Sequence, residues 1–313
     1  MAWRAPPRRD VREWGERDEG RWVCEDRRVP ATEPIDLLHQ GTRVIGIYLL
    51  DTPEGPAIVD CGPTSTLENL RAGLAERGLR PDELRHLVLT HIHLDHAGAA
   101  GTLARENPDL RVHVSPIGAP HLLDPSRLER SARRLYGDSF DALWGELAPV
   151  PAGNLRQVGS SVAGLAAFPT PGHASHHVSY LDADGTVYAG DSVGVRILPA
   201  RHILPVSPPP EVDLDGWHRT LNEIERRRPQ RLALTHFGVV DDPGDHLARM
   251  REGLDLWAAR VREGMTEDEF VKAARQDLHA DEGPDADYYE RAGPLWQSYA
   301  GLRRYWDKRE RAA

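Results

Sequence analysis

The sequence predicts an α/β domain at about residues 35–245, followed by a small helical C-terminal part at residues 246–313. Between residues 44 and 234, short apolar runs of strand length alternate with segments that have helical spacing, an order typical of α/β folds. Beyond residue 245 only helical spacing remains. Residues 1–34 carry many arginines and acidic residues without sustained apolar periodicity, so we expect an N-terminal extension that is loosely ordered.

The first half of the domain opens with two apolar runs, 44–50 and 57–59, whose polar connection predicts a hairpin. Leu67, Leu70 and Leu74 share one helical face and predict a helix that ends near Gly78. The segments expected after it are a strand at 87–89, a helix at 97–105, a strand at 111–115 and an amphipathic helical insertion at 117–147.

The second half repeats the alternation. The expected elements are strands at 161–168, 178–181 and 187–189, a proline-rich loop at 194–212, a helix at 214–228 and a last strand at 231–234. Three helices are expected after these, at 246–263, 266–279 and 285–309, and Thr266 opens the second with a Thr-x-x-Glu capping pattern.

Composition limits the possible function classes. No stretch approaches the roughly 20 apolar residues that cross a bilayer, and the N-terminus has no signal-peptide pattern, so we expect a cytoplasmic protein. Cys24 and Cys61 belong to no Cys-x-x-Cys pair, which excludes a zinc finger and favours free thiols. The net charge of −10 argues against a general affinity for nucleic acid but does not exclude a small charged substrate.

Four short motifs each follow an apolar strand, where a loop held by a rigid scaffold can present ligands. They are HIHLDH at residues 91–96, GH at 172–173, GD at 190–191 and TH at 235–236. The recurrence at four strand ends makes surface histidines by chance a poor explanation. The candidate ligands that they contain are His91, His93, Asp95, His96, His173, Asp191 and His236.

Imidazole and carboxylate ligands without thiolate suit zinc, iron(II) or manganese. Seven ligands are too many for one tetrahedral ion, but they suit two ions about 3.5–4 Å apart that share a carboxylate and a water. His91 and His93 are two residues apart and point the same way in an extended segment. Asp95 and His96 come after the turn into a helix and can face the second ion.

These motifs, in this order, resemble the metallo-β-lactamase superfamily in its glyoxalase II-like branch, and the match covers roughly residues 35–245. The resemblance implies a four-layer αββα sandwich with a small helical C-terminal part. It implies further that His91, His93 and His173 hold one metal, that Asp95, His96 and His236 hold the second, and that Asp191 bridges them. Asp60 matches a position that supports the motif loop.

Two divalent ions, expected to be zinc with iron or manganese as alternatives, lower the pKa of a shared water toward about 7. The resulting bridging hydroxide attacks an electrophilic centre while the metals polarise the substrate oxygen. Asp95 is the expected group to orient this hydroxide and to carry a proton to the leaving group. We therefore predict a metal-dependent hydrolase that cleaves a small thioester, ester or lactone.

Several alternatives stay open. Lactonase relatives place a tyrosine shortly after the bridging aspartate, where this chain has Ser192, and the basic C-terminal cluster of true glyoxalase II is not recognisable. A phosphodiesterase on the same fold is a second candidate. A mononuclear iron persulfide dioxygenase that uses His91, His173 and Asp191 is a third.

The remaining candidates concern the surroundings of the metals. His177, four residues after His173 of the GH motif, is expected to hydrogen-bond locally, and His202 in the proline-rich loop is a candidate substrate contact. Tyr136 and Trp144 of the insertion fit core packing by their spacing, but their position between metal motifs also suggests a pocket wall. The aromatic C-terminus could cover the site or form a homodimer contact.

Overall fold

The structure is a computed structural model that describes residues 15–17, 21–23, 33–282 and 286–312. The predicted N-terminal extension lies mostly outside these residues. Within it, β1 (Gly15–Arg17) and β2 (Arg21–Val23) pair antiparallel.

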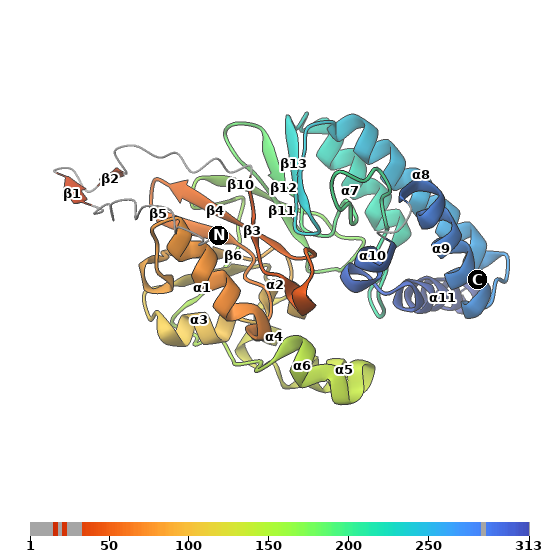
Figure 1. The fold of residues 1–313 in the computed structure, drawn as a ribbon, viewed down its shortest axis with the longest axis horizontal. Coiled ribbons are helices and arrows are strands. Elements are labelled where there is room, and N and C mark those ends of the chain that lie inside the picture. The colour runs from red at the N-terminus through yellow and green to blue at the C-terminus, as the bar shows by residue number, and fades with distance from the viewer. Residues whose placement is uncertain (1–14, 18–20, 24–32, 283–285, 313) are drawn as a thin grey trace, which may run out of the picture.

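Two mixed six-stranded sheets form the centre of the fold (Figure 1). The first has the order β3 (Ile35–Asp36), β4 (Gly46–Thr52), β5 (Gly55–Val59), β6 (His86–Val88), β7 (Arg111–Val114) and β8 (Leu155–Gln157). The second has the order β14 (Gly238–Val240), β13 (Arg231–Leu234), β12 (Thr186–Tyr188), β11 (Val178–Leu181), β10 (Leu165–Pro169) and β9 (Ser161–Val162).

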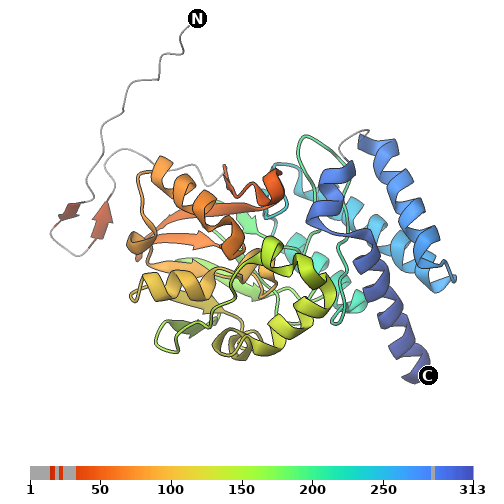
Figure 2. The ribbon, with the colours of Figure 1, turned by 60° about the horizontal axis from the view of Figure 1, so that its bottom comes forward.

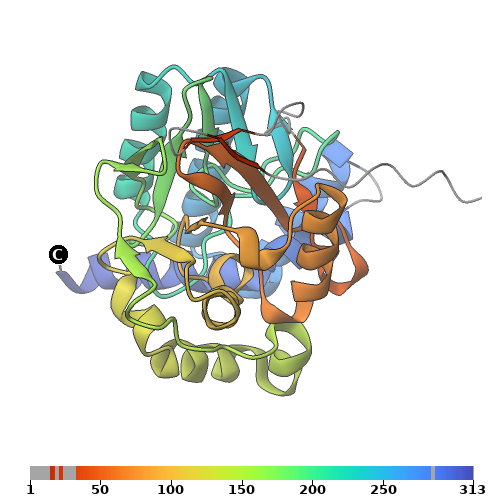
Figure 3. The same cartoon turned by 90° about the vertical axis from the view of Figure 1, so that its left-hand side faces the viewer.

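Helices cover the outer face of each sheet, which confirms the predicted αββα sandwich (Figures 1 and 3). Those of the first half are α1 (Leu67–Glu76), α2 (Leu94–Ala97), α3 (Ala100–Glu106), α4 (Ala119–Leu123), α5 (Ser126–Tyr136) and α6 (Phe140–Trp144). Those of the second half are α7 (Leu214–Arg226), α8 (Pro243–Arg262), α9 (Glu267–Glu282), α10 (Ala286–Ala292) and α11 (Leu295–Ala312).

Strand β4 shows why the layers form. Its side chains alternate between the two faces of the sheet, and both faces are buried. Ile47 and Leu49 belong to the apolar cluster under α1 and α3, whereas Tyr48 and Leu50 belong to the cluster between the two sheets. The run of consecutive apolar residues in the sequence therefore reflects a strand with a helix layer on one side and a sheet on the other.

Two buried tyrosines connect the sheets near the strand ends that carry the motifs. Tyr48 donates hydrogen bonds to the carbonyl oxygens of Leu234 (2.7 Å) and Gly238 (2.9 Å), and Tyr180 donates to that of Leu89 (2.7 Å). Because a buried phenol needs a partner, these bonds fix the relative position of the two sheets at this edge.

The C-terminal helices pack into the core of the second sheet. Leu247 and Met250 of α8 share an apolar cluster with Leu232 of β13, and Leu302 of α11 belongs to the same cluster. An added Cβ on Gly301 of α11 would lie 1.9 Å from the carbonyl oxygen of Ser207, so the helix backbone rests directly on the proline-rich loop. Within the described residues no helix is both long and apolar enough to cross a membrane.

Some predicted elements were wrong in detail. The strand expected at 161–168 is a hairpin, because Ala163 and Gly164 both have positive φ (47° and 83°) and form a tight turn between β9 and β10. The helix expected at 285–309 breaks before Pro294, which lacks the backbone N–H that a continuing helix needs. The predicted last strand, 231–234, is followed by β14, and the helix expected at 97–105 is divided between α2 and α3.

His86 and His113 lie on neighbouring strands and predict an acid-sensitive point in the fold. Nδ1 of His86 lies 2.9 Å from Nε2 of His113. Burial, together with the charge of His86, lowers the pKa of His113 to about 4. The native state favours the neutral ring of His113. This preference therefore stabilises the folded protein fully above the ordinary pKa of about 6.5, and the stabilisation is lost as the pH falls toward 4.

We therefore expect a His86→Leu/His113→Leu variant to depend less on pH than the wild type. Between pH 7 and 4.5 its free energy of unfolding should fall by about 2 kcal/mol less, measured by urea unfolding at each pH. Parallel pH profiles would contradict this account of the pair.

Candidate metal centre

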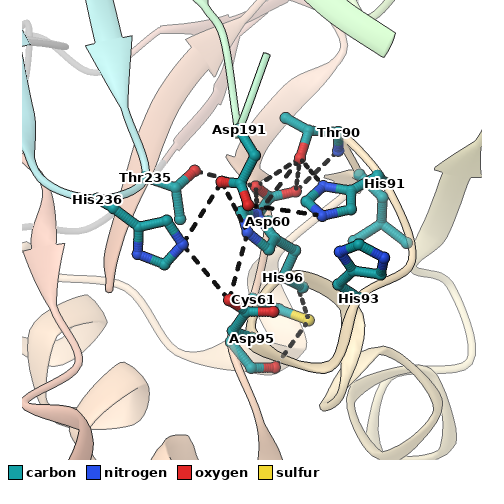
Figure 4. Close-up of polar contacts among 12 residues, drawn as sticks. Asp60, Cys61, Thr90, His91, His93, Asp95, His96, Asp191, Thr235 and His236 are labelled. Carbon is teal, nitrogen blue, oxygen red and sulfur yellow. Dashed lines mark hydrogen bonds and ion pairs between the residues drawn. The ribbon is translucent and has the colours of Figure 1, made fainter. Parts of the chain in front are cut away.

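The four motifs meet at one edge of the sandwich. His91 follows β6, while His173, Asp191 and His236 follow β10, β12 and β13. Figure 4 shows the side chains of His91, His93, Asp95 and His96 gathered near those of Asp191 and His236, which come from other loops. The predicted assembly of these residues is therefore present in the structure.

Three of the imidazoles form a first group. The group contains one ring nitrogen from each of His91, His93 and His173, and these three atoms lie within 4.8 Å of one another. Nδ1 of His93 is 2.9 Å from Nε2 of His173, and the ring centroids of His91 and His93 are 4.5 Å apart. His91 and His173 are buried and His93 is half-buried, which is the arrangement of a site open on one side.

A second group contains Asp95, His96, Asp191 and His236, whose ligand atoms also lie within 4.8 Å of one another. Oδ2 of Asp95 is 3.4 Å from Nε2 of His236 and 3.7 Å from Nε2 of His96. These two imidazoles and two carboxylates form a compact ligand set without sulfur, of the kind that suits zinc, iron(II) or manganese.

Asp191 lies between the groups and presents one carboxylate oxygen to each. Its Oδ1 is 3.2 Å from Nε2 of His96 and 3.5 Å from Nε2 of His236. Its Oδ2 is 3.4 Å from Nε2 of His173 and 4.0 Å from Nε2 of His91. This is the geometry expected of a carboxylate that is shared by two neighbouring ions.

In four of the imidazole rings, Nδ1 points away from the centre and has a hydrogen-bonding partner that fixes the orientation of the ring. Nδ1 of His96 lies 2.7 Å from Oδ2 of Asp60, and Nδ1 of His173 lies 2.8 Å from the carbonyl oxygen of Val206. Nδ1 of His236 contacts the carbonyl oxygen of Val44, and that of His91 lies 3.1 Å from Oγ1 of Thr90. In His96, His173 and His236 the Nδ1–H donates to an oxygen, which directs Nε2 toward the centre.

Asp60 organises the layer beneath the ligands (Figure 4). The residue is fully buried and its φ of 61° is unusual for a residue other than glycine. Its carboxylate accepts hydrogen bonds from the backbone N–H (2.8 Å) and hydroxyl of Thr90 and from the hydroxyl of Thr235 (3.3 Å), as well as from His96. It therefore joins the HIHLDH loop to the loop that carries His236. Thr90 directly precedes the HIHLDH motif and Thr235 belongs to the TH motif, but the sequence analysis gave neither threonine a role in this network.

His177 supports the backbone of Asp191. Its Nδ1 is 2.8 Å from the hydroxyl of Thr170, and its Nε2 accepts a hydrogen bond from the N–H of Asp191 (3.1 Å). An added Cβ on Gly190, which has a φ of 50°, would lie 2.7 Å from both His177 Nε2 and Thr90 Oγ1, so only glycine fits at this position. The expected local hydrogen bonding of His177 is present.

Several buried ligand atoms have no hydrogen-bond partner among the described residues. They are Nε2 of His91, His96 and His236 and Oδ1 of Asp191. Buried polar atoms in native proteins are nearly always paired, because leaving one unpaired costs about 1–3 kcal/mol. Four such atoms directed at one small volume fit a site that binds cations.

The carboxylates and imidazoles also perturb one another strongly. Burial alone would lower the pKa of His96, but the charges of Asp191, Asp95 and Asp60 hold it well above its ordinary value. Burial would raise the pKa of Asp191, yet the neighbouring His96, His236 and His173 hold it well below the usual range. In the first group, burial lowers the pKa of His91 and of His93 well below the ordinary value. The carboxylates that favour a proton on His96 would also attract cations, and cation binding there would release that proton.

A cavity of about 500 Å³ opens above the centre. Asp95, Asp191 and His236 lie at its base, and Tyr136 and Trp144 of the insertion form part of its wall. The end of α10, the start of α11 and the connection between them form another part, with lining residues within 290–297. The sequence predicted that the aromatic C-terminus could cover the site or form a homodimer contact, but it did not single out Arg291 or Gln297. His202 is not among the described lining residues; its ring lies 5.9 Å from that of Tyr289.

The comparisons with known proteins agree with this site. The family model described as "Metallo-beta-lactamase superfamily" matches residues 41–236. The chain belongs to this superfamily. YobT of Bacillus subtilis, described as uncharacterized, is 27% identical over 163 residues, which cover 49% of this chain and 63% of YobT. The metallo-beta-lactamase fold-containing protein ST1585 of Sulfurisphaera tokodaii is 27% identical over 180 residues, or 54% of this chain and 67% of ST1585.

Solved structures show the same fold. The crystal structure of ST1585, described as an archaeal metallo-beta-lactamase superfamily protein, has a TM-score of 0.60 at 22% identity and covers 87% of this chain and 96% of its own. TTHA1623 in a di-iron-bound form has a TM-score of 0.50 at 24% identity and covers 66% of this chain and 91% of its own. The chain is thus a metallo-beta-lactamase-fold protein with a His/Asp metal-binding site.

The contact between Asp60 and His96 predicts a role in metal affinity. Asp60→Asn keeps the size of the side chain but removes the charge that orients the ring of His96. We expect about 10–100-fold weaker binding of zinc, measured by competition with a chelating dye. Asp51→Asn, at an exposed position of β4, is the matched control and should leave affinity unchanged. Equal affinities for both variants and the wild type would show that Asp60 serves folding alone.

Proposed function

We propose that the protein is a dinuclear metal-dependent hydrolase that cleaves a small ester-like substrate, namely a thioester, an ester or a lactone. The observation that carries the proposal is the position of Asp191, whose two carboxylate oxygens face two separate ligand groups. The unpartnered Nε2 atoms of both groups support it, because they leave a donor set ready for two cations.

In this proposal His91, His93 and His173 hold one ion, Asp95, His96 and His236 hold the other, and Asp191 bridges the pair. Bound cations would supply a Lewis acid for a carbonyl oxygen and would lower the pKa of water at the site toward neutrality. Zinc is the proposed ion. Iron and manganese suit the same donors, and TTHA1623 has been described in a di-iron-bound form.

Asp95 has the position of a proton carrier. It lies at the base of the cavity with 21% of its side chain exposed, whereas the other residues of its group are almost fully buried. Its carboxylate can accept a hydrogen bond from an attacking water and orient it toward the substrate. After attack, the same carboxylate can pass the proton to the leaving group.

The cavity wall favours an uncharged or weakly charged acyl group. Leu128, Ala132, Leu135, Tyr136 and Trp144 form an apolar side opposite the proline-rich loop. Arg291 is the only arginine or lysine among the described lining residues. A phosphodiester in a nucleic acid needs several cations along its backbone, so this wall supports a carbonyl ester over that alternative.

The test combines metal counting with a substrate panel. Protein purified without added metal is analysed by plasma mass spectrometry and reconstituted with zinc, then assayed with thioesters, lactones, carboxylic esters and phosphodiesters. Two zinc ions per chain and turnover of a carbonyl ester support the proposal. Turnover of phosphodiesters alone favours a phosphodiesterase. One iron per chain with oxygen uptake on glutathione persulfide favours the dioxygenase.

The bridging role predicts the behaviour of Asp191→Ala. Because the substitution removes a ligand from both ions, we expect fewer than one bound ion per chain and a loss of activity of at least about 1,000-fold. Asp268→Ala, at an exposed position of α9, is the control and should keep both ions and full activity. A fully metallated and active Asp191→Ala protein would refute the bridge.

A further inference from the structure

Tyr136 is the last residue of α5 and lines the cavity above the metal centre. It comes from the helical insertion, outside the four motifs that supply the ligands. The carboxylate of Asp95 is close enough to contribute, after the larger effect of burial, to a pKa of about 12 for the Tyr136 hydroxyl. This hydroxyl therefore stays protonated at neutral pH, and Tyr136 lines the same cavity as Asp95, Asp191 and His236.

The partner of the hydroxyl defines its hydrogen-bonding role. Nε2 of Gln297, on α11, lies 3.3 Å from Oη of Tyr136, and Gln297 is only 4% exposed. An amide NH₂ can only donate, so Oη accepts this bond and keeps its own proton for another acceptor. Among the described residues no acceptor for that proton is present, and both Tyr136 and Gln297 line the cavity.

Two aromatic rings, Trp144 and His39, hold Tyr136 in place. Its ring meets Trp144 edge to face with centroids 5.1 Å apart, and Trp144 stacks on His39 at 5.3 Å. Nε2 of His39 is 2.9 Å from the carbonyl oxygen of Leu143, which anchors the stack to α6. Figure 2 shows the insertion lying beside the C-terminal helices, the two parts of the chain that the bond from Gln297 joins. A donor on such a packed support costs little reorganisation when it binds a ligand.

We propose that the Tyr136 hydroxyl donates a hydrogen bond to the oxygen of the reacting carbonyl group of the substrate. Gln297 is then a positioning residue that turns the hydroxyl toward the cavity. The bond strengthens as negative charge develops on that oxygen, so it lowers the barrier more than it tightens substrate binding. No proton is transferred, and Tyr136 stays a phenol throughout. This inference rests on the proposed ester hydrolysis.

The test is Tyr136→Phe, which keeps the ring and its packing but removes the donor. With the best ester of the panel we expect kcat to fall about 10–100-fold while KM changes less than about threefold. Gln297→Leu should lower kcat by a smaller factor, about 3–10-fold, because the hydroxyl remains but is no longer oriented. Tyr305→Phe is the matched control, since its hydroxyl contacts Arg309 and does not line the cavity; its kcat should equal that of the wild type.

A second measurement does not depend on turnover. Butylphosphonate carries charged tetrahedral oxygens like those of the attacked carbonyl, and calorimetry on zinc-loaded protein gives its dissociation constant. We expect about tenfold weaker binding to Tyr136→Phe, with unchanged zinc content and thermal midpoint. Equal phosphonate affinity and equal kcat would overturn the role of Tyr136 while ester hydrolysis by the wild type stands. A wild type that hydrolyses no carbonyl ester would instead overturn the proposed function, and the inference with it.

Discussion

The two carboxylate oxygens of Asp191 lie within 3.2 Å of His96 Nε2 on one side and 3.4 Å of His173 Nε2 on the other. A single buried carboxylate therefore links two groups of ligands that come from both sheets. Without it, the closely spaced imidazoles of the two groups would have no shared carboxylate between them. The sandwich holds this carboxylate from below, through the bond from its backbone N–H to His177 and through a glycine at position 190 that leaves room for the contact.

The support beneath the ligands and the reactive surface above them come from different parts of the chain. Asp60, Thr90 and Thr235 lie between the two sheets and fix ligand-bearing loops by hydrogen bonds. The cavity above is completed by α5, α6, the end of α10 and the start of α11. In the proposed hydrolase, this division would separate the activation of water, which depends on the sheet edge, from the choice of acyl group, which depends on helices outside the ligand motifs. Tyr136 and Gln297 connect the two helical parts directly above the site.

The ligand set could be predicted from the sequence because each motif directly follows a strand, and strand ends converge at a sheet edge. The hairpin at β9 and β10 could not, since Ala163 has a positive φ that the residue type does not favour. The cavity wall was predictable only in part. Tyr136 and Trp144 stood out as aromatics of the insertion, but the contributions of Gln297 and Arg291 depend on how α10 and α11 return to the site, a long-range packing that no local pattern encodes. His202 was singled out by its place in the proline-rich loop, yet its ring lies against Tyr289.

The central claim is that two ions share the carboxylate of Asp191. X-ray absorption spectroscopy on protein reconstituted with zinc tests it most directly, because scattering from a second metal reports the distance between the ions. The account predicts a zinc–zinc distance of about 3.5–4 Å and a first shell of nitrogen and oxygen without sulfur. A single zinc per chain with no metal–metal scattering, in protein that is fully active, would contradict it.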